Sequence, residues 1–496
     1  MPDAADVGTA ANIWMGASYQ GQWYLRDGLE WRLFNDGALP IAITGQALSS
    51  ATEVQVVSNL DISSLSGLEI YVGYGRDESD MRSSPGKLAR IYTVLSAPAV
   101  PAPGVGGTFA ARFSQGSAGF YYNPPTLTGS HIYIGTSRGI NYEVATDNIF
   151  YKLDLNLGKV WEFPLGSLQV RGSAALDSNG NTYFVVEEGM LPGNSASARL
   201  HLYSLDKDGR YRGSRLISTS APNVGMLNPA ISSDDTIYVG GDRLYAFDAA
   251  GNTKWTYGSF PDTIRNAPVI DMAGNIFFGA PNSIVSLDRN GIQRWIFAVQ
   301  GTPVASPAFS VDYTKVFVAV ANILYCLRTD SGAKVWQFTP NGMSGDFRAT
   351  PAVDNNNNVY LGTKANSSSV FYAVRADGSG LLWENRIGAD LYSSPALGND
   401  GIVYVGSEWT GAQKRLHAID MATGAEVWGV AYPNSGNDTT WSSPALSDAG
   451  ILYVGSMDYL GEGGAVYAVR TSATGLLPYA GSARFHGGNS STGRRE

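Results

Sequence analysis

Apolar and polar positions alternate with a period of two along most of the chain, which favours strands over helices. One pattern recurs: a Pro-Ala-apolar triplet, a short Asp/Asn/Gly turn, and a strand similar to Tyr-Val-Gly. Its first residue, which we call the anchor, recurs every 39 to 55 residues, the spacing of a four-stranded propeller blade. The anchors are Pro125, Ala174 (in a degenerate copy), Pro229, Pro268, Pro307, Pro351, Pro395 and Pro444.

A second apolar strand, a turn with Asp or Gly and a closing aromatic residue follow in each copy. The closing residue is tryptophan at Trp161, Trp255, Trp295, Trp336, Trp383 and Trp428. Two copies depart from this, with Tyr211 in the second and Pro478-Tyr479 in the last. The repeat therefore predicts an all-β protein with an eight-bladed β-propeller of four-stranded antiparallel blades, each inner strand starting near its anchor.

The repeat is absent from residues 1–95, which hold several short strand-like runs instead: 23–25, 31–34, 54–57, 68–72 and 91–94. These runs predict a small antiparallel β-sandwich of about five to seven strands. Residues 96–107 alternate Pro with small residues, which is typical of a semi-extended linker. We therefore expect a sandwich-like domain at 1–95, a linker at 96–107 and the propeller at 108–496.

Composition excludes several classes of protein. Lys plus Arg number 34 and Asp plus Glu 43, giving a net charge of −9, which argues against nucleic acid as a partner. Cys326 is the only cysteine, so the chain has no internal disulfide and no thiolate metal cluster. It has no apolar run of transmembrane length. Residues 1–6 lack the features of a signal peptide, which leaves either a cytosolic protein or one whose leader is already removed.

Residues 418–428, Ala-Ile-Asp-Met-Ala-Thr-Gly-Ala-Glu-Val-Trp, resemble the tryptophan-docking motif of the quinoprotein alcohol dehydrogenase-like (PQQ-like repeat) propellers. Weaker copies lie at 327–336 and 247–255, and residues 484–494 resemble a segment common at the ends of these propellers. The resemblance covers residues 108–496. It implies kinship either with pyrroloquinoline quinone (PQQ) dehydrogenases or with non-catalytic relatives such as the lipoprotein subunit of the outer-membrane β-barrel assembly machine.

The dehydrogenases that the resemblance suggests typically need a calcium or lanthanide ion, a catalytic Asp and, in many members, a disulfide of adjacent cysteines. The single Cys326 rules out that disulfide, and no carboxylate pair stands at matching positions. We therefore expect no cofactor, no metal and no enzymatic activity. A PQQ- and metal-dependent dehydrogenase stays as the first alternative.

The residue three before each anchor is expected to lie near the mouth of the central channel. These residues are Tyr122, Arg171, Met226, Arg265, Val304, Arg348, Tyr392 and Trp441. The three arginines and three aromatic residues among them could hold a planar anion, so they are the candidate channel ligand site. The alternative is that they only fill the channel. For the six closing tryptophans we expect a structural role, packing one blade on the next.

Three further patterns each allow a functional and a structural interpretation. Gly135–Gly139 matches the Gly-x-Ser-x-Gly elbow of hydrolases, but it enters a hairpin, and we interpret it as chance. Acidic turns beginning at Asp177, Asp206 and Asp354 resemble parts of calcium loops, but tight hairpins require the same residues. Sugar stacking or core packing would each explain the aromatic residues of the first domain, which are Trp14, Trp23, Tyr24 and Trp31.

The resulting prediction is a non-enzymatic, extracytoplasmic or cell-surface protein that uses the propeller as a platform for protein partners. The location, which is periplasmic, outer-membrane-associated or secreted, follows from the resemblance and from the Lys-poor, Gly/Ser/Asn-rich composition, with the leader absent from this sequence. A glycan-binding surface adhesin is the second alternative.

Overall fold

The structure is a computed structural model of the chain, and it divides into two compact units, Met1–Val100 and Pro101–Glu496. The division falls within the Pro-rich segment 96–107. The described residues are 9–19, 22–27, 30–34, 39–47, 69–83, 88–93, 106–114, 118–120, 122–137, 147–189, 198–219, 226–260, 263–341, 345–365, 368–408, 415–433, 438–439, 441–458, 463–488 and 493.

The first unit contains one six-stranded antiparallel sheet in the order β3-β2-β1-β5-β6, with β4 paired to β1. Its elements are β1 (Ala10–Tyr19), β2 (Gln22–Asp27), β3 (Glu30–Phe34), β4 (Ile43–Ala47), β5 (Glu69–Gly75), α1 (Glu78–Ser83) and β6 (Leu88–Thr93). Most of β1 is buried, including the continuous run 13–17, and Met81 of α1 is buried as well. The described residues thus form one sheet with a short helix. The strand expected at 54–57 lies outside them.

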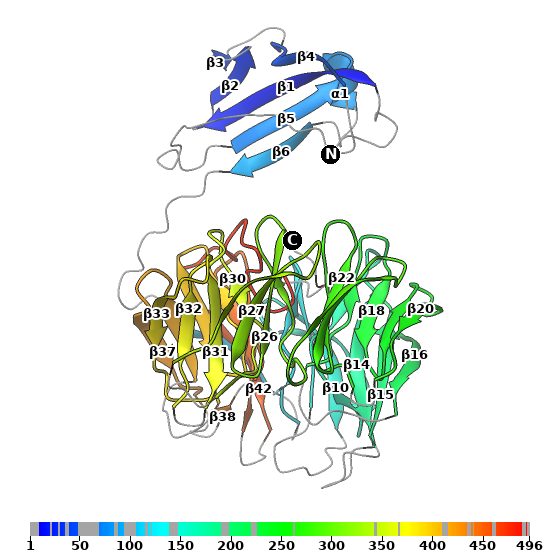
Figure 1. Cartoon of the computed structure of the whole chain (residues 1–496). Helices are drawn as coiled ribbons and strands as arrows, with labels where there is room; N and C mark the ends of the chain where they lie inside the picture. The colour runs from blue at the N-terminus through cyan, green and yellow to red at the C-terminus, as the bar shows by residue number, and fades with distance from the viewer. Residues whose placement is uncertain are drawn as a thin grey trace. The chain divides into compact units, whose positions relative to one another are not determined.

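The described part of the second unit forms eight antiparallel sheets with a path of four strands each, arranged around a common axis (Figure 1), and one two-stranded sheet, β38-β41. The innermost strands are β8 (Thr126–Leu127), β13 (Ala175–Leu176), β17 (Ala230–Ile231), β21 (Val269–Ile270), β25 (Ala308–Phe309), β30 (Ala352–Val353), β34 (Ala396–Leu397) and β39 (Ala445–Leu446). The second strands are β9 (His131–Gly135), β14 (Thr182–Glu188), β18 (Ile237–Gly240), β22 (Ile276–Ala280), β26 (Lys315–Val320), β31 (Val359–Lys364), β35 (Ile402–Gly406) and β40 (Ile451–Gly455).

The outer half of each sheet follows the same order. The third strands are β10 (Asn148–Asp154), β15 (Arg199–Leu205), β19 (Leu244–Phe247), β23 (Ser283–Leu287), β27 (Ile323–Arg328), β32 (Phe371–Val374), β36 (Leu416–Asp420) and β42 (Ala465–Arg470). The outer strands are β11 (Lys159–Gly166), β16 (Tyr211–Ser218), β20 (Thr253–Tyr257), β24 (Gln293–Ala298), β28 (Lys334–Phe338), β33 (Leu381–Asn385), β37 (Glu426–Val430) and β7 (Phe109–Ser114). Short added strands are β12 (Gln169–Val170), β29 (Asp346–Phe347), β38 (Asp438–Thr439) and β41 (Met457–Asp458).

The last sheet takes its outer strand from the beginning of the unit. Its order is β39-β40-β42-β7, and β7 pairs with β42 through partners such as Ala111 and Ala468. The innermost strands β39 and β8 are also in contact. The expectation that Pro478-Tyr479 closes the last repeat is therefore wrong, because hydrogen bonding between the two ends of the unit provides that strand instead.

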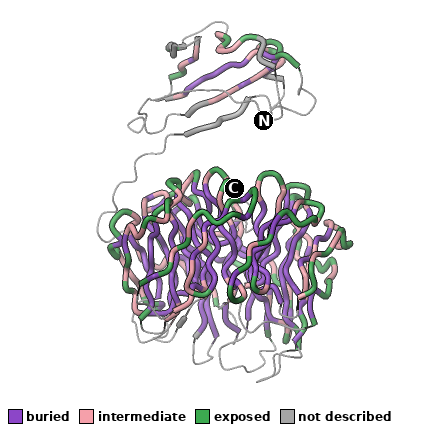
Figure 2. Tube along the Cα trace, viewed as in Figure 1, coloured by how far each residue is buried: buried purple, intermediate pink, exposed green. Residues whose placement is uncertain are grey.

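Burial explains why the inner strands are continuously apolar rather than alternating. Every residue of β22, β23 and β35 is buried, because each sheet is covered by a neighbour on both faces. The apolar clusters accordingly span two sheets; one of them joins Phe317 and Cys326 to Leu361 and Tyr372. The outer strands, such as β20 and β28, mix exposed with half-buried positions, and exposed residues concentrate in the turns (Figure 2).

The acidic turns are closed by their own hydrogen bonds. In the turn at Asp354, Oδ1 accepts from the backbone N–H groups of Asn356 and Asn358, and Oδ2 accepts from the Tyr360 hydroxyl. The turns at Asp177 and Asp206 accept backbone N–H groups in the same way. A hydrogen bond from the Arg210 backbone lowers the pKa of Asp206. The carboxylates are thus engaged as turn formers.

In the part of the chain that the structure describes, α1 is the one helix, which confirms the all-β prediction. None of the described helical structure is long and apolar enough to cross a membrane.

Candidate functional site

The residues three before the anchors gather at the axis, but they do not all face the same space. Six of them line one axial pocket together with Ser306, Thr350, Ser394 and Phe485: Tyr122, Met226, Val304, Arg348, Tyr392 and Trp441. The pocket encloses about 400 Å³, including space open to solvent. Arg171 and Arg265 are not among its lining residues.

The three aromatic residues of the predicted site form one continuous cluster. Trp441 stacks on Tyr392 with ring centroids 3.8 Å apart and planes 11° apart. Tyr122 meets the same indole edge-on at 5.1 Å. Burial, reinforced by Glu408 and Asp390, raises the pKa of Tyr392, so its phenol is neutral at physiological pH. This cluster forms a rigid apolar wall on one side of the pocket.

The three predicted arginines have separate environments. Arg171 is buried in an ion pair with Glu187, 3.1 Å from Nε to Oε2, and its guanidinium lies 4.8 Å from the Tyr122 ring centroid. Arg348 lines the pocket, and its Nη2 lies 3.0 Å from Asp346 Oδ2. The buried Nε of Arg265 makes no hydrogen bond with the described residues. One guanidinium, rather than three, is therefore available to a ligand in the pocket.

A belt of hydroxyl groups from four successive repeats, three of which line the pocket, links neighbouring sheets. The backbone N–H groups of Ala267, Ser306, Thr350 and Ser394 each donate to the hydroxyl oxygen of the residue before the next anchor, at 2.9 to 3.0 Å. The acceptors are Ser306, Thr350, Ser394 and Ser443. This belt was not predicted, although the sequence carries a signal for it: a Ser or Thr stands directly before four anchor prolines.

The C-terminal segment closes the other end of the channel. Backbone N–H groups of the innermost strands donate to it, from Val353 to Ser482 O and from Leu397 to Ala483 O. The fully buried Arg484 donates to the carbonyls of Pro444 and Pro125, which precede two innermost strands. Phe485 then forms part of the pocket lining. Of the predicted terminal segment 484–494, residues 489–492 and 494 lie outside the described residues.

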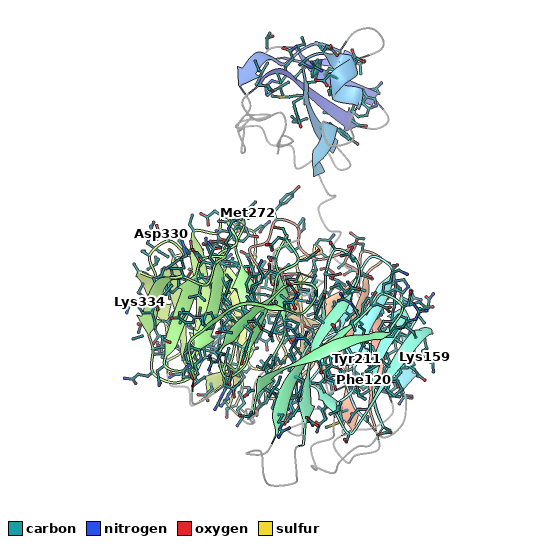
Figure 3. All side chains as sticks on the ribbon, turned by 90° about the vertical axis from the view of Figure 1, so that its right-hand side faces the viewer. Phe120, Lys159, Tyr211, Met272, Asp330 and Lys334 are labelled. Atoms are coloured by element: carbon teal, nitrogen blue, oxygen red, sulfur yellow. The ribbon has the colours of Figure 1, made fainter. Side chains whose placement is uncertain are left out.

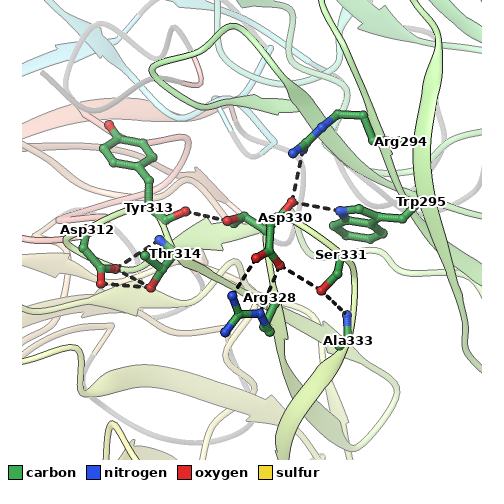
Figure 4. A network of polar contacts seen from close by, with 10 residues as sticks. Arg294, Trp295, Asp312, Tyr313, Thr314, Arg328, Asp330, Ser331 and Ala333 are labelled. Carbon is green, nitrogen blue, oxygen red and sulfur yellow. Dashed lines mark hydrogen bonds and ion pairs between the residues drawn. The ribbon is translucent and has the colours of Figure 1, made fainter. Parts of the chain in front are cut away.

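The closing tryptophans contact the following sheet in a repeated geometry. The indole N–H donates to a turn carbonyl in five cases: Trp161 to Lys207, Trp255 to Arg289, Trp295 to Thr329, Trp336 to Ala376 and Trp383 to Met421. Figure 4 shows this contact at Trp295, where Arg294 donates to the same carbonyl and Arg328 pairs with Asp330 in the turn. Each indole also lies over a glycine of that turn with positive φ, for example Gly332.

Trp428 makes the corresponding contact with the last sheet, whose outer strand β7 comes from the beginning of the unit. A Cβ added to Gly106 or Gly107 would meet its indole at 2.2 and 3.1 Å. These glycines directly precede β7, so the best copy of the docking motif packs on the segment that completes the last sheet.

The second sheet departs from this geometry in a way that the sequence did not reveal. Each docking tryptophan is the strand partner of the third residue of its repeat's Leu-Tyr-Ala-Phe-like run, as Trp255 is of Ala246. In the second sheet this partner is Gly213, opposite Ser204. Tyr211 pairs two positions away with Leu205 and is 51% exposed (Figure 3). Tyr211 is therefore not the equivalent of the tryptophans.

A serine–histidine–glutamate arrangement lies within one sheet and was not predicted. Ser407 Oγ is 3.1 Å from His417 Nε2, and His417 Nδ1 is 3.0 Å from Glu426 Oε1. Ser407 is fully buried, and its backbone N–H already donates to Arg415 O, so neither the nucleophile nor this amide can reach a substrate. His417 replaces the tyrosine found at this place in neighbouring strands, such as Tyr245, so we assign it a structural role.

The remaining sequence candidates do not assemble into sites. Ser137 of the Gly-x-Ser-x-Gly match is fully buried and bridges to Gly119. In the first unit Trp14 is buried and donates to Leu39 O, while Trp23 and Tyr24, being consecutive in β2, point to opposite faces. The side chain of Trp31 lies outside the described residues. A shared stacking platform is therefore not formed by Trp14, Trp23 and Tyr24.

The donor set of the axial pocket does not fit a metal-bound quinone. Among the described residues, its lining contains one guanidinium, hydroxyls and aromatic rings but no carboxylate. No group of three or more His, Cys, Asp or Glu that could hold a metal ion occurs among the residues described. Hard cations such as calcium require several oxygen ligands including carboxylates. The pocket thus offers no place for the ion that accompanies such a cofactor.

Comparisons with known proteins agree with this architecture. The family model described as outer membrane protein assembly factor BamB matches residues 202–430. BamB from Moraxella catarrhalis has a TM-score of 0.51 at 14% identity, covering 74% of this chain and all of that one. Quinohemoprotein alcohol dehydrogenase from Comamonas testosteroni has a TM-score of 0.53 at 13% identity, covering 76% and 78%. No curated protein matches the chain.

A third similar structure is Chaetomium thermophilum Sqt1 bound to the N-terminus of ribosomal protein L10, with a TM-score of 0.51 at 12% identity, covering 73% of this chain and 99% of that one. At these identities the solved structures show the fold alone. Together with the family model they confirm a PQQ-like β-propeller similar to BamB.

Proposed function

We propose that the protein is a non-enzymatic, extracytoplasmic scaffold in which an eight-bladed propeller, residues 108–496, binds protein partners. In this proposal residues 1–95 form a separate domain and 96–107 a linker. The observation that carries it is the axial channel, which is plugged at one end by Arg484 and Phe485 and lined without carboxylates. The described lining of this channel supplies none of the carboxylate ligands that a metal-bound quinone needs, which supports a binding role for the propeller's loops and outer strands.

Similarity to BamB supports a role among envelope proteins, since the matching model describes an outer membrane protein assembly factor. We therefore place the protein in the periplasm or at the outer membrane. Cell fractionation of the native bacterium, with protease added to intact cells and to spheroplasts, tests this location. Protection in spheroplasts, as for a cytosolic marker, would contradict it.

Partner binding is tested in the native cell by photo-crosslinking. A photoreactive residue is placed at exposed apolar positions of the outer strands, namely Val160, Leu216, Ile296, Val335 and Val427. Defined adducts at some of these positions, reproduced with the purified partner at micromolar affinity, are the expected result. The buried position Val318 is the matched control, where no adduct should form. The absence of any adduct at the exposed positions, or equal adducts at Val318, would contradict the proposal.

The dehydrogenase alternative requires a separate test. Purified protein is incubated with PQQ and calcium, and dye-linked oxidation of alcohols and sugars is measured together with PQQ binding by calorimetry. We expect neither binding nor turnover. Turnover that is lost in an Arg348→Gln variant, while its melting temperature is unchanged, would establish the enzyme instead.

A further inference from the structure

Two interfaces between sheets lack a docking indole, and at the one between the second and third sheets the Arg215 guanidinium lies over the turn glycine beside a remaining pocket. Six tryptophans lie over glycines with positive φ in the following turn: Gly209, Gly291, Gly332, Gly378, Gly424 and Gly107. Between the second and third sheets the turn is of the same kind, with Gly251 at φ +82° and Asp248 closing it. The residue that should carry the indole is Gly213.

The vacancy is visible in the burial of the residue beneath it. Ser204 is half-buried, as is Lys152, the partner of Trp161, whereas the five other equivalents beside tryptophans are fully buried: Ala246, Ser286, Cys326, Ala373 and Ala418. A pocket of about 340 Å³, including space open to solvent, occupies this place. Buried Leu202, Ile237 and Phe247 supply apolar lining, and Gly213 and Gly251 lie at its edge. The pocket thus has the location and apolar lining of an aromatic side-chain site.

The eighth interface, which also lacks a tryptophan, is closed differently. Ala111 of β7 occupies the position that a docking tryptophan holds in six other sheets. There the Tyr453 hydroxyl donates to Leu155 O, and Leu157 is buried in the same apolar cluster as Tyr453. Other contacts thus take the place of the indole at the eighth interface, whereas a pocket remains at the Gly213 interface.

Two arginines line the pocket and replace the polar contacts of the missing indole. Arg212 Nη2 donates to Ala249 O at 2.9 Å, the turn carbonyl equivalent to the indole acceptor elsewhere. Arg215 Nε donates to Gly251 O at 2.7 Å. Both residues are exposed, and no carboxylate among the described residues lies within ion-pair distance of either guanidinium. The carboxylate of Asp248, in the pocket wall, already accepts hydrogen bonds from the backbone N–H groups of Ala250 and Asn252 and from the Asn252 side-chain amide.

We propose that this pocket, bounded by Gly213, Arg212 and Arg215, receives an aromatic side chain from an acidic segment of a protein partner. The apolar lining accepts the ring, and the two planar cations can stack on it and bind carboxylates beside it. The chain has a net charge of −9, so two arginines without a carboxylate partner are a local excess of positive charge. They favour a partner segment with acidic residues beside the aromatic ring. The inference rests on the proposed scaffold function and identifies one of its surfaces.

The test uses the full chain and the peptide acetyl-Asp-Asp-Trp-Asp-Asp-amide, with binding followed by calorimetry. Two peptides are controls: one with Ala in place of Trp, and one with Lys in place of each Asp. We expect saturable binding of the acidic Trp peptide, at least tenfold weaker binding of both controls, and a loss of affinity with added salt. Equal binding of the Ala peptide, tighter binding of the Lys peptide, or no binding at millimolar peptide would overturn the proposal.

Two variants locate the site on the protein. The double variant Arg212→Gln/Arg215→Gln removes both charges, and Ser204→Leu fills the pocket while keeping them. Each should weaken the acidic Trp peptide at least tenfold, while Arg289→Gln, an exposed arginine in the next sheet, leaves binding unchanged. If the folded Ser204→Leu variant binds the peptide as the native protein does, the peptide does not bind in this pocket. A partner found by crosslinking that binds Ser204→Leu normally overturns this inference alone and leaves the scaffold function standing.

Discussion

The indole of Trp383 lies directly on the backbone of Gly424 in the next sheet, so close that a Cβ at Gly424 would come within 2.6 Å of indole Cδ2. Gly424 has φ +74°, and the indole N–H donates to Met421 O in the same turn. Tryptophan and glycine therefore act as one unit: positive φ forms the tight turn, and the missing side chain lets the ring lie flat on it.

Gly424→Ala should destabilise the protein through two separable costs. Positive φ costs a non-glycine residue about 1–2 kcal/mol. Displacing the indole of Trp383 adds about 1–3 kcal/mol of overpacking. Urea unfolding measures the sum.

The matched control is Gly401→Ala, which shares the positive φ of +77° but has no atom within 4 Å of the added Cβ. It should show only the backbone cost of about 1–2 kcal/mol. Equal destabilisation of the two variants would show that the indole contact contributes nothing to the cost.

Thr350→Val tests the hydroxyl belt around the channel. The substitution keeps the shape of the side chain but leaves the buried N–H of Ser306 without its acceptor, 3.0 Å away in the native protein. An unsatisfied buried amide costs about 1–3 kcal/mol. Thr350→Ser keeps the hydroxyl and should lose less. If valine and serine variants unfold at the same urea concentration, the belt hydrogen bond is not a source of stability.

Local patterns in the sequence predicted the repeats, the anchors and the docking tryptophans, because each depends on residues close together in the chain. The outer strand of the last sheet depends instead on pairing between Ala111 and Ala468, at opposite ends of the unit. No local pattern carries that information, so the sequence alone pointed to Pro478-Tyr479 as the end of the last repeat. Likewise Gly213 was missed because the strand register, rather than the nearest aromatic residue, decides which position faces the next sheet.

The candidate site was predicted less well than the fold. Six of the eight residues at equal spacing from the anchors line one pocket, but the direction of each side chain depends on partners elsewhere. Arg171 forms an ion pair with Glu187 in β14, and the spacing of the anchors contains no information about that partner. By contrast, Tyr392 and Trp441 stack because adjacent repeats place two flat rings side by side.

Arg484→Gln should loosen the C-terminal plug. Arg484 donates to Pro444 O, Pro125 O and Gly488 O and is fully buried, so its loss leaves carbonyls unpaired at about 1–3 kcal/mol each. Hydrogen exchange should accelerate at Val353 and Leu397, whose amides donate to the plug. Arg470→Gln, an exposed arginine in the last sheet, should change neither quantity. Native protection at both amides in the Arg484 variant would contradict the plug's dependence on this side chain.

Cys326 should make stability fall in alkaline solution. Burial raises the pKa of its thiol from 9.0 to about 12, so the native state holds a proton that the unfolded chain loses above pH 9. Fewer bound protons in the unfolded chain mean that the free energy of unfolding decreases as pH rises from about 9 to 12, by about 1.4 kcal/mol per unit at most. Cys326→Ala lacks this term and keeps every titrating tyrosine. The stability advantage of the native protein over the variant should therefore shrink between about pH 8 and pH 10.5 in urea unfolding. A constant difference across that range would mean that the thiol keeps its ordinary pKa in the folded protein.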